Sequence, residues 1–199
     1  MSTMSVMISR EPTIERLALA RGLLLEPFGL TEADLGTTLA SIAEHRIDDA
    51  DLYFQYTRSE GWSLEEGIVK TGSFAIDQGV GVRAVAGEKT AFAYADDISA
   101  ASLSDAARTV RAIGASGQSR RIKLPPPKVA TSRTLYGALD PISTLASADK
   151  VTLLERMEGL ARAKDKRVVQ VMASLASEYD VALIARLDGL LAADVRPLV

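Results

Sequence analysis

The chain has 199 residues, of which 47% are hydrophobic and 25% charged, enough apolar material for one large domain or one domain with an arm. Its formal net charge of −3 argues against nucleic acids and anionic membranes as partners, because both require a concentrated basic surface. The sequence has no cysteine, which excludes disulfides, thiolate catalysis and cysteine metal ligands within it.

The sequence near the N-terminus lacks the pattern of a signal peptide, because the apolar run Leu23–Leu25 is short and is followed by Glu26 and Pro27. No stretch approaches the roughly 20 apolar residues that a membrane-spanning helix requires. The absence of cysteine fits a reducing compartment. These features together predict a cytoplasmic protein without a membrane partner.

Residues 1–28 are predicted to form an N-terminal arm with one helix from Thr13 to Leu25, beginning just after a proline. A second helix is predicted from Thr31, where Thr31 and Asp34 have the spacing of a capping box. Residues 29–199 are expected to form one α+β domain.

Between Asp51 and Asp96 the apolar period changes to two, which is typical of strands. Turn residues interrupt this pattern at Glu60-Gly61, Thr71-Gly72 and Gly87-Glu88. The pattern therefore predicts a four-stranded antiparallel meander.

Two further helices are predicted, one from Ser99 or Ser102 to a stop near Gly114, and one from a cap at Ser147 to about Lys164. The apolar positions assigned to the second of them are Leu153, Leu154, Met157, Leu160 and Ala161.

The segment between these helices is expected to be irregular, with an extended stretch at the prolines 125–127. The basic cluster just before it, Arg120, Arg121 and Lys123, is interpreted as a solvated linker in preference to a phosphate-binding patch.

Alternating residues over 169–175 and 181–187 predict strands, and Asp188-Gly189 predicts a hairpin turn into a third strand from Leu190. That strand is still apolar at Val199, so we expect the natural polypeptide to continue. The predicted fold class is α+β, an antiparallel β meander plus a second set of antiparallel strands packed with two to four helices.

The candidate catalytic groups are few. His45, the single histidine, is predicted in the last turn of the helix from Thr31, where an exposed histidine is favoured by the helix dipole. It has no second histidine at metal-ligand spacing, and a catalytic zinc needs three protein ligands.

Three acidic pairs are candidates for acid/base groups: Asp48-Asp49, Glu65-Glu66 and Asp96-Asp97. Adjacent residues on a strand point to opposite faces, so Glu65 and Glu66 are not expected to form a dyad. Asp96-Asp97 is interpreted as a helix-start cap. No catalytic, cofactor-binding or metal-ligating residue is assigned from the sequence.

The glycine spacing in Gly79-Val80-Gly81 is similar to that of a nucleotide-binding loop, but the segment lies inside a predicted strand and no helix follows it. We expect the two glycines to form a smooth sheet face on which another element packs closely, more readily a helix of this chain than a ligand.

Several blocks of the sequence, in order and spacing over residues 30–199, resemble the N-terminal part of the TldD branch of the TldD/PmbA family, the modulators of DNA gyrase. The matching blocks are residues 51–55, 64–65, 68–70, 72–73, 76–85, 87–96, 165–168 and 188–199.

The resemblance implies the non-catalytic N-terminal domain of a cytoplasmic zinc metallopeptidase that cleaves unfolded or ribosomally made peptides. It also implies a heterodimer with a PmbA-like subunit that lacks the metal. The family's zinc ligands, a His-Glu-x-x-x-His helix and a later cysteine, belong to its C-terminal half, so no zinc is expected in this chain and the 199 residues alone are predicted to be inactive.

An alternative left open is a stand-alone peptide- or protein-binding domain of the gyrase-modulator type without enzymatic activity. A third is a structural domain that only completes its neighbour. The isolated chain is also expected to self-associate weakly through the exposed edge of its last strand.

Overall fold

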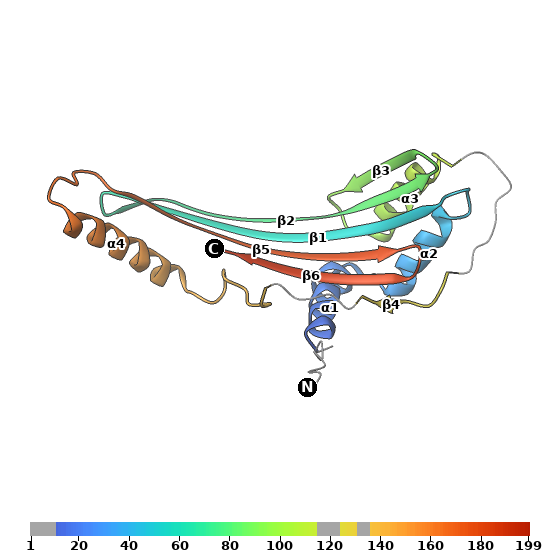
Figure 1. Ribbon diagram of the computed structural model, residues 1–199, viewed down its shortest axis with the longest axis horizontal. Helices are drawn as coiled ribbons and strands as arrows, with labels where there is room; N and C mark the ends of the chain where they lie inside the picture. Colours follow the sequence, from blue (N-terminus) through green and yellow to red (C-terminus); the bar gives the residue numbers. More distant parts are fainter. Residues whose placement is uncertain (1–10, 115–123, 131–135) are drawn as a thin grey trace, which may run out of the picture. The chain divides into compact units, whose positions relative to one another are not determined.

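The computed structural model describes residues 11–114, 124–130 and 136–199. They form an α+β fold, four helices with a six-stranded, mostly antiparallel sheet, as predicted (Figure 1). The helices are α1 (Glu11–Leu24), α2 (Glu32–Ile42), α3 (Ala100–Arg111) and α4 (Ser147–Lys164), with a short 3-10 helix η1 (Glu26–Phe28). None of the helices in these residues combines the length and hydropathy needed to cross a membrane.

The strand order in the sheet is β3-β2-β1-β5-β6-β4. The six strands are β1 (Asp49–Glu65), β2 (Ile68–Ala86), β3 (Lys89–Ala95), β4 (Lys128–Val129), β5 (Met172–Arg186) and β6 (Leu190–Leu198). The meander and the second set of strands thus share one sheet, and the short β4 pairs in parallel with the start of β6.

The chain divides into two compact units, and the long strands pass from one into the other. Unit 1 takes the described residues of Met1–Tyr56, Gln78–Leu135 and Val181–Asp194. Unit 2 takes Thr57–Asp77, Tyr136–Asp180 and Val195–Val199.

Unit 1 has its core between the sheet and the helices α1, α2 and α3. Leu35, Leu39 and Ile42 of α2 are fully buried, as are Phe54 of β1 and Val82 of β2. α3 packs against both α2 and β3. Burial of large apolar side chains at this density supplies most of the driving force for folding of this unit.

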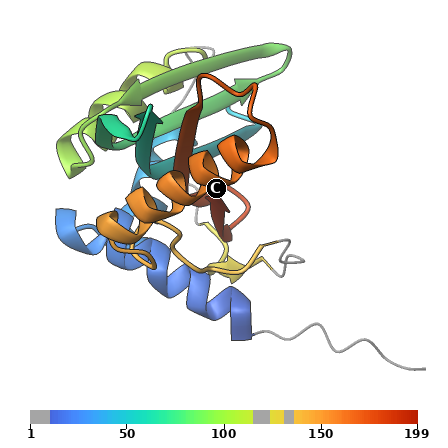
Figure 2. The ribbon, with the colours of Figure 1, turned by 90° about the vertical axis from the view of Figure 1, so that its left-hand side faces the viewer.

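Unit 2 has a smaller core beneath α4. Leu154 of α4 packs with Leu64 of β1 and Ala173 of β5, and Trp62 and Leu175 lie partly buried against them. Figure 2 shows α4 lying across the strands of this unit.

The prediction of four strands in the meander was wrong, because there are three. Glu60-Gly61 and Thr71-Gly72 lie inside β1 and β2, and the chain reverses at Glu66-Gly67, where φ is 53° and 73°. Both glycines allow close contact between the two strands: a Cβ on Gly72 would lie 2.9 Å from the Trp62 ring, and one on Gly61 would lie 3.0 Å from Ser73 Oγ. The turn at Gly87-Glu88 is confirmed.

The predicted helices and the last hairpin are confirmed, with boundaries shifted by a few residues. Thr31 and Asp34 form the predicted capping box, and the Asp34 carboxylate accepts from the Thr31 hydroxyl and backbone, which lowers the pKa of Asp34. Asp188-Gly189 forms the turn between β5 and β6, with Gly189 at φ +82°. The two strands predicted before it are one continuous strand, β5, and Val169 lies outside it.

The face predicted for α4 was wrong in part. Leu154 is buried, but Leu153, Met157 and Leu160 are 40–62% exposed. The buried neighbours of Leu154 one turn away are Lys150 and Glu158. The sheet-facing side of this helix therefore carries two charged residues, and each has a polar partner in unit 2.

Candidate functional site

The three acidic pairs have structural partners in the described residues. Asp48 accepts a hydrogen bond from the Gly87 backbone at 2.6 Å, and Asp49 forms ion pairs with Arg83 and Arg186. These contacts fix the ends of β1 and β2 in unit 1.

The other two pairs sit at element ends. Asp97 accepts from the Ser99 and Ser102 hydroxyls at the start of α3, and these two hydrogen bonds lower its pKa. The N-cap of α3 is Ser99, so the interpretation of Asp96-Asp97 as the cap itself was wrong. Glu66, in the β1–β2 turn, accepts from the Val171 backbone and from Arg162, contacts that lower its pKa. Its neighbour Glu65 accepts from Gln170, so the two carboxylates do not act together.

His45 lies past the end of α2, which stops at Ile42, and is half-buried, so the prediction of an exposed histidine in the last helical turn was wrong. Its Cβ lies 3.0 Å from where a Cβ on Gly114 would sit. Its Nδ1 atom is buried without a hydrogen-bond partner in the described residues.

Gly79 and Gly81 face β3. A Cβ on Gly79 would lie 2.8 Å from the Ala95 carbonyl oxygen, and one on Gly81 would lie 2.9 Å from the Phe92 ring. The close approach that the glycines allow is therefore made by the neighbouring strand and not by a helix, which corrects the expectation from the sequence. Neither glycine lines either pocket described below.

No group of three or more His, Cys, Asp or Glu residues that could hold a metal ion occurs in the part of the chain that the structure describes. The residues present therefore do not fit a zinc centre, which takes three or four such ligands. The basic cluster at 120–123 lies outside the described residues.

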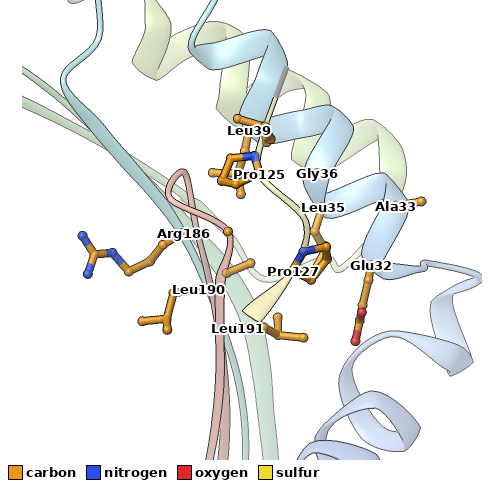
Figure 3. Close-up of a pocket in the computed structure, with 13 residues that line it drawn as sticks. Glu32, Ala33, Leu35, Gly36, Leu39, Pro125, Pro127, Arg186, Leu190 and Leu191 are labelled. Atoms are coloured by element: carbon orange, nitrogen blue, oxygen red, sulfur yellow. The ribbon is translucent and has the colours of Figure 1, made fainter. Parts of the chain in front are cut away.

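Unit 1 contains a pocket of about 400 Å³ with apolar walls (Figure 3). Its lining includes Leu35 and Leu39 of α2, Pro125 and Pro127 of the proline segment, and Leu190 of β6. The Arg186 guanidinium points away from the prolines, and Glu32 at the rim is bound to Arg21. This pocket offers apolar contact without an acid or base directed into it.

Unit 2 contains a buried ion pair that links α4 to β1. Lys150 Nζ lies 2.6 Å from Glu60 Oε2, and the two side chains are 3% and 6% exposed. Lys150 also donates to the Ile142 carbonyl at 2.7 Å, and the Trp62 indole N–H donates to Glu60. Both charges therefore have several partners, as buried charges require.

The loop that supplies the Ile142 carbonyl is itself held by Asp140. Asp140 Oδ1 accepts from the Ile142 backbone at 2.9 Å, and its carboxylate is bound to Arg58 and Ser143. Burial acts to raise the pKa of Asp140, but these hydrogen bonds outweigh it and lower the pKa.

A second contact ties α4 to the β1–β2 turn. Glu158 accepts from the Gly67 backbone at 2.7 Å and from Arg162 at 2.8 Å, while Arg162 also bonds Glu66. Glu60, Lys150 and Glu158 were not predicted from the sequence. The four-residue spacing of Lys150, Leu154 and Glu158 could have marked the face of the helix that is buried.

Two family models match the chain. The model described as PmbA/TldA metallopeptidase domain 1 matches residues 50–114, and the one described as the PmbA/TldA metallopeptidase central domain matches residues 140–199. The first match contains Glu60 and the second contains Lys150, so the ion pair of unit 2 joins residues from the two matched segments.

The sequence is also similar to curated proteins named Metalloprotease TldD homolog. Identity is 47% over 176 residues to the protein from Haemophilus influenzae and 40% over 176 residues to the one from Buchnera aphidicola subsp. Schizaphis graminum. Each alignment covers 88% of this chain and 36% of the relative, so the chain spans little more than a third of their length.

Solved structures share the fold. A proposed modulator of DNA gyrase from Bacteroides thetaiotaomicron superposes with a TM-score of 0.63 at 12% identity, covering 83% of this chain and 38% of that one. TldE from Thermococcus kodakarensis gives a TM-score of 0.59 at 17% identity, covering 82% and 37%.

Proposed function

This chain belongs to the PmbA/TldD metallopeptidase family, carrying its N-terminal and central domains, and from that premise we propose that it is the non-catalytic part of a TldD-like zinc metallopeptidase. In this proposal the whole protein cleaves unfolded or ribosomally made peptides in the cytoplasm. The zinc ligands belong to residues that this chain does not contain, and a PmbA-like subunit is the partner.

The observation that carries the proposal is the alignment with TldD homologues, which covers 88% of this chain but 36% of each relative. The carboxylates of Asp48, Asp97 and Glu66, one from each acidic pair, are engaged in hydrogen bonds at turns and at a helix start, which agrees with a role outside the metal centre. Each unit contains a pocket in which part of a peptide could bind.

A second candidate function is a stand-alone peptide- or protein-binding domain. The pockets of the two units favour it, because each has apolar walls that could bind a side chain, and binding alone requires no catalytic group. The two functions differ in whether this chain supports cleavage when it is joined to a metal-bearing domain.

A chimera tests the first function directly. We expect cleavage of unfolded casein when this chain replaces the matching 176 residues of the Haemophilus influenzae Metalloprotease TldD homolog and the PmbA-like subunit of that organism is added. The natural full-length pair is the positive control, and the same chimera treated with a zinc chelator is the negative control.

A folded chimera that pairs with the PmbA-like subunit but cleaves nothing, beside an active natural pair, would contradict the first function and favour the binding domain.

A further inference from the structure

Unit 2 contains a pocket of about 430 Å³. Its walls come from β1, β2 and the segment before α4, with Trp62, Phe74 and Leu145 as the large apolar side chains. Glu60 and Lys150 also line it. Such a volume is in the range of small-molecule and side-chain sites.

The walls are aromatic and are accessible to a ligand. The Trp62 ring packs on the β2 backbone at Gly72, so closely that a Cβ there would be 2.9 Å from it. Phe74 is 58% exposed and Leu145 is 47% exposed. Two aromatic rings and an exposed leucine around one pocket favour a large apolar group, since aromatic pairs add to the burial of area.

The polar part of the pocket is the ion pair of Glu60 and Lys150. A lysine ammonium has three N–H donors, and Lys150 uses two of them, on Glu60 and on the Ile142 carbonyl. One donor is left without a partner in the described residues. The adjacent Glu60 carboxylate makes the pair neutral overall and would repel a second carboxylate brought to Lys150.

We propose that this pocket binds a large uncharged side chain of a peptide, with the neighbouring backbone carbonyl of that peptide accepting the third N–H of Lys150. An internal peptide residue combines an apolar side chain with a neutral acceptor, which matches the walls and the ion pair. The inference rests on the proposed function for the choice of a peptide, and it adds a preference for aromatic or large aliphatic residues at a point outside the metal centre.

Trp62 is the only tryptophan of the chain and forms a wall of the pocket, so its fluorescence reports directly on this site. The 199-residue chain is titrated with the neutral peptide acetyl-Gly-Phe-Gly-amide. We expect a saturable change in Trp62 emission. The matched acetyl-Gly-Ala-Gly-amide should bind at least about tenfold more weakly, because it lacks the buried ring.

A third peptide tests the charge argument. Acetyl-Gly-Phe with a free carboxylate should also bind at least about tenfold more weakly than the neutral peptide, because of Glu60. Equal binding of the alanine and phenylalanine peptides, tighter binding of the free acid, or no saturable signal would each overturn the proposal.

Two variants on one strand separate the pocket from the sheet surface. Phe74→Ala should weaken binding of the phenylalanine peptide about tenfold. Ile76→Ala changes a residue of similar exposure, 53%, on the same face of β2 but outside the pocket, and should leave binding within about twofold. Both wild-type side chains are largely exposed, so both variants are expected to fold, which thermal unfolding verifies.

An equal loss in the two variants would contradict the assignment of the pocket. The titration requires no cleavage, so it can fail while the chimera remains active, and the chimera can fail while the titration succeeds.

Discussion

Replacing Lys150 by methionine is expected to lower the free energy of unfolding of unit 2 by about 3–5 kcal/mol. The change leaves the Glu60 carboxylate, whose side chain is 6% exposed, without its cation in the interior of the unit. The Trp62 indole N–H would still donate a hydrogen bond to this carboxylate. Urea unfolding followed by the emission of Trp62 measures the effect, because this side chain lies in the same cluster.

Two controls distinguish an unpaired charge from a general loss of packing. Lys164→Met alters an exposed lysine in the last turn of the same helix and should change the free energy of unfolding by less than about 0.5 kcal/mol. The double variant Glu60→Leu with Lys150→Met removes both charges and should recover most of the loss, since apolar replacements of a buried pair are often neutral. A single Lys150→Met variant as stable as the wild type would show that the pair does not hold α4 to the sheet.

Replacing Leu154 by alanine is expected to destabilise unit 2 by about 2–5 kcal/mol. Leu154 is 0% exposed and packs with Leu64 and Ala173 in a core with few other large members. The substitution removes contacts with both β1 and β5, and the small core has few large side chains that could move into the resulting cavity.

The neighbouring residue provides the matched control. Leu153→Ala removes the same atoms from a side chain that is 40% exposed, and we expect it to change the free energy of unfolding by less than about 1 kcal/mol. Similar losses in the two variants would mean that both leucines face an apolar surface. In that case the assignment of the buried face of α4 would have to be revised.

The fold was largely predictable from local patterns. The capping residues Thr31 and Ser99 mark helix starts, and Asp188-Gly189 marks the hairpin between β5 and β6. These signals are local because a cap or a two-residue turn is satisfied by neighbours in sequence. The α+β class and the antiparallel meander followed from the same patterns.

The errors in the strands have one physical cause. Gly61 and Gly72 were interpreted as turn residues, but each lies where a side chain of the neighbouring strand, Ser73 or Trp62, approaches the backbone. Glycine serves both purposes, and only the pairing of the strands decides between them. The actual turn at Glu66-Gly67 was harder to recognise in the sequence, because its first residue with a positive φ is a glutamate and not one of the residues typical of turns.

The site of unit 2 could not be predicted from the sequence. Glu60 and Lys150 are 90 residues apart, and nothing local to either indicates a partner. The apolar residues Leu153, Met157 and Leu160 of α4 obscured the spacing of its buried side. The expectation that this chain holds no catalytic residue came from the composition, with one histidine and no cysteine, and it stays a prediction.

The proposed partner subunit and the expected self-association of the chain stay predictions. The short β4 pairs only with Leu190 and Leu191. The outer edge of β6 beyond them has no neighbouring strand among the described residues. An edge of this kind can accept a strand from another chain.

The central claim, that this chain serves a metallopeptidase without holding its metal, is tested most directly by metal analysis of the purified 199-residue chain, with a casein cleavage assay on the same sample. The account predicts far less than one zinc per chain after dialysis and no cleavage, because one histidine and no thiolate are present. One tightly bound zinc per chain, with cleavage that a chelator abolishes, would contradict it.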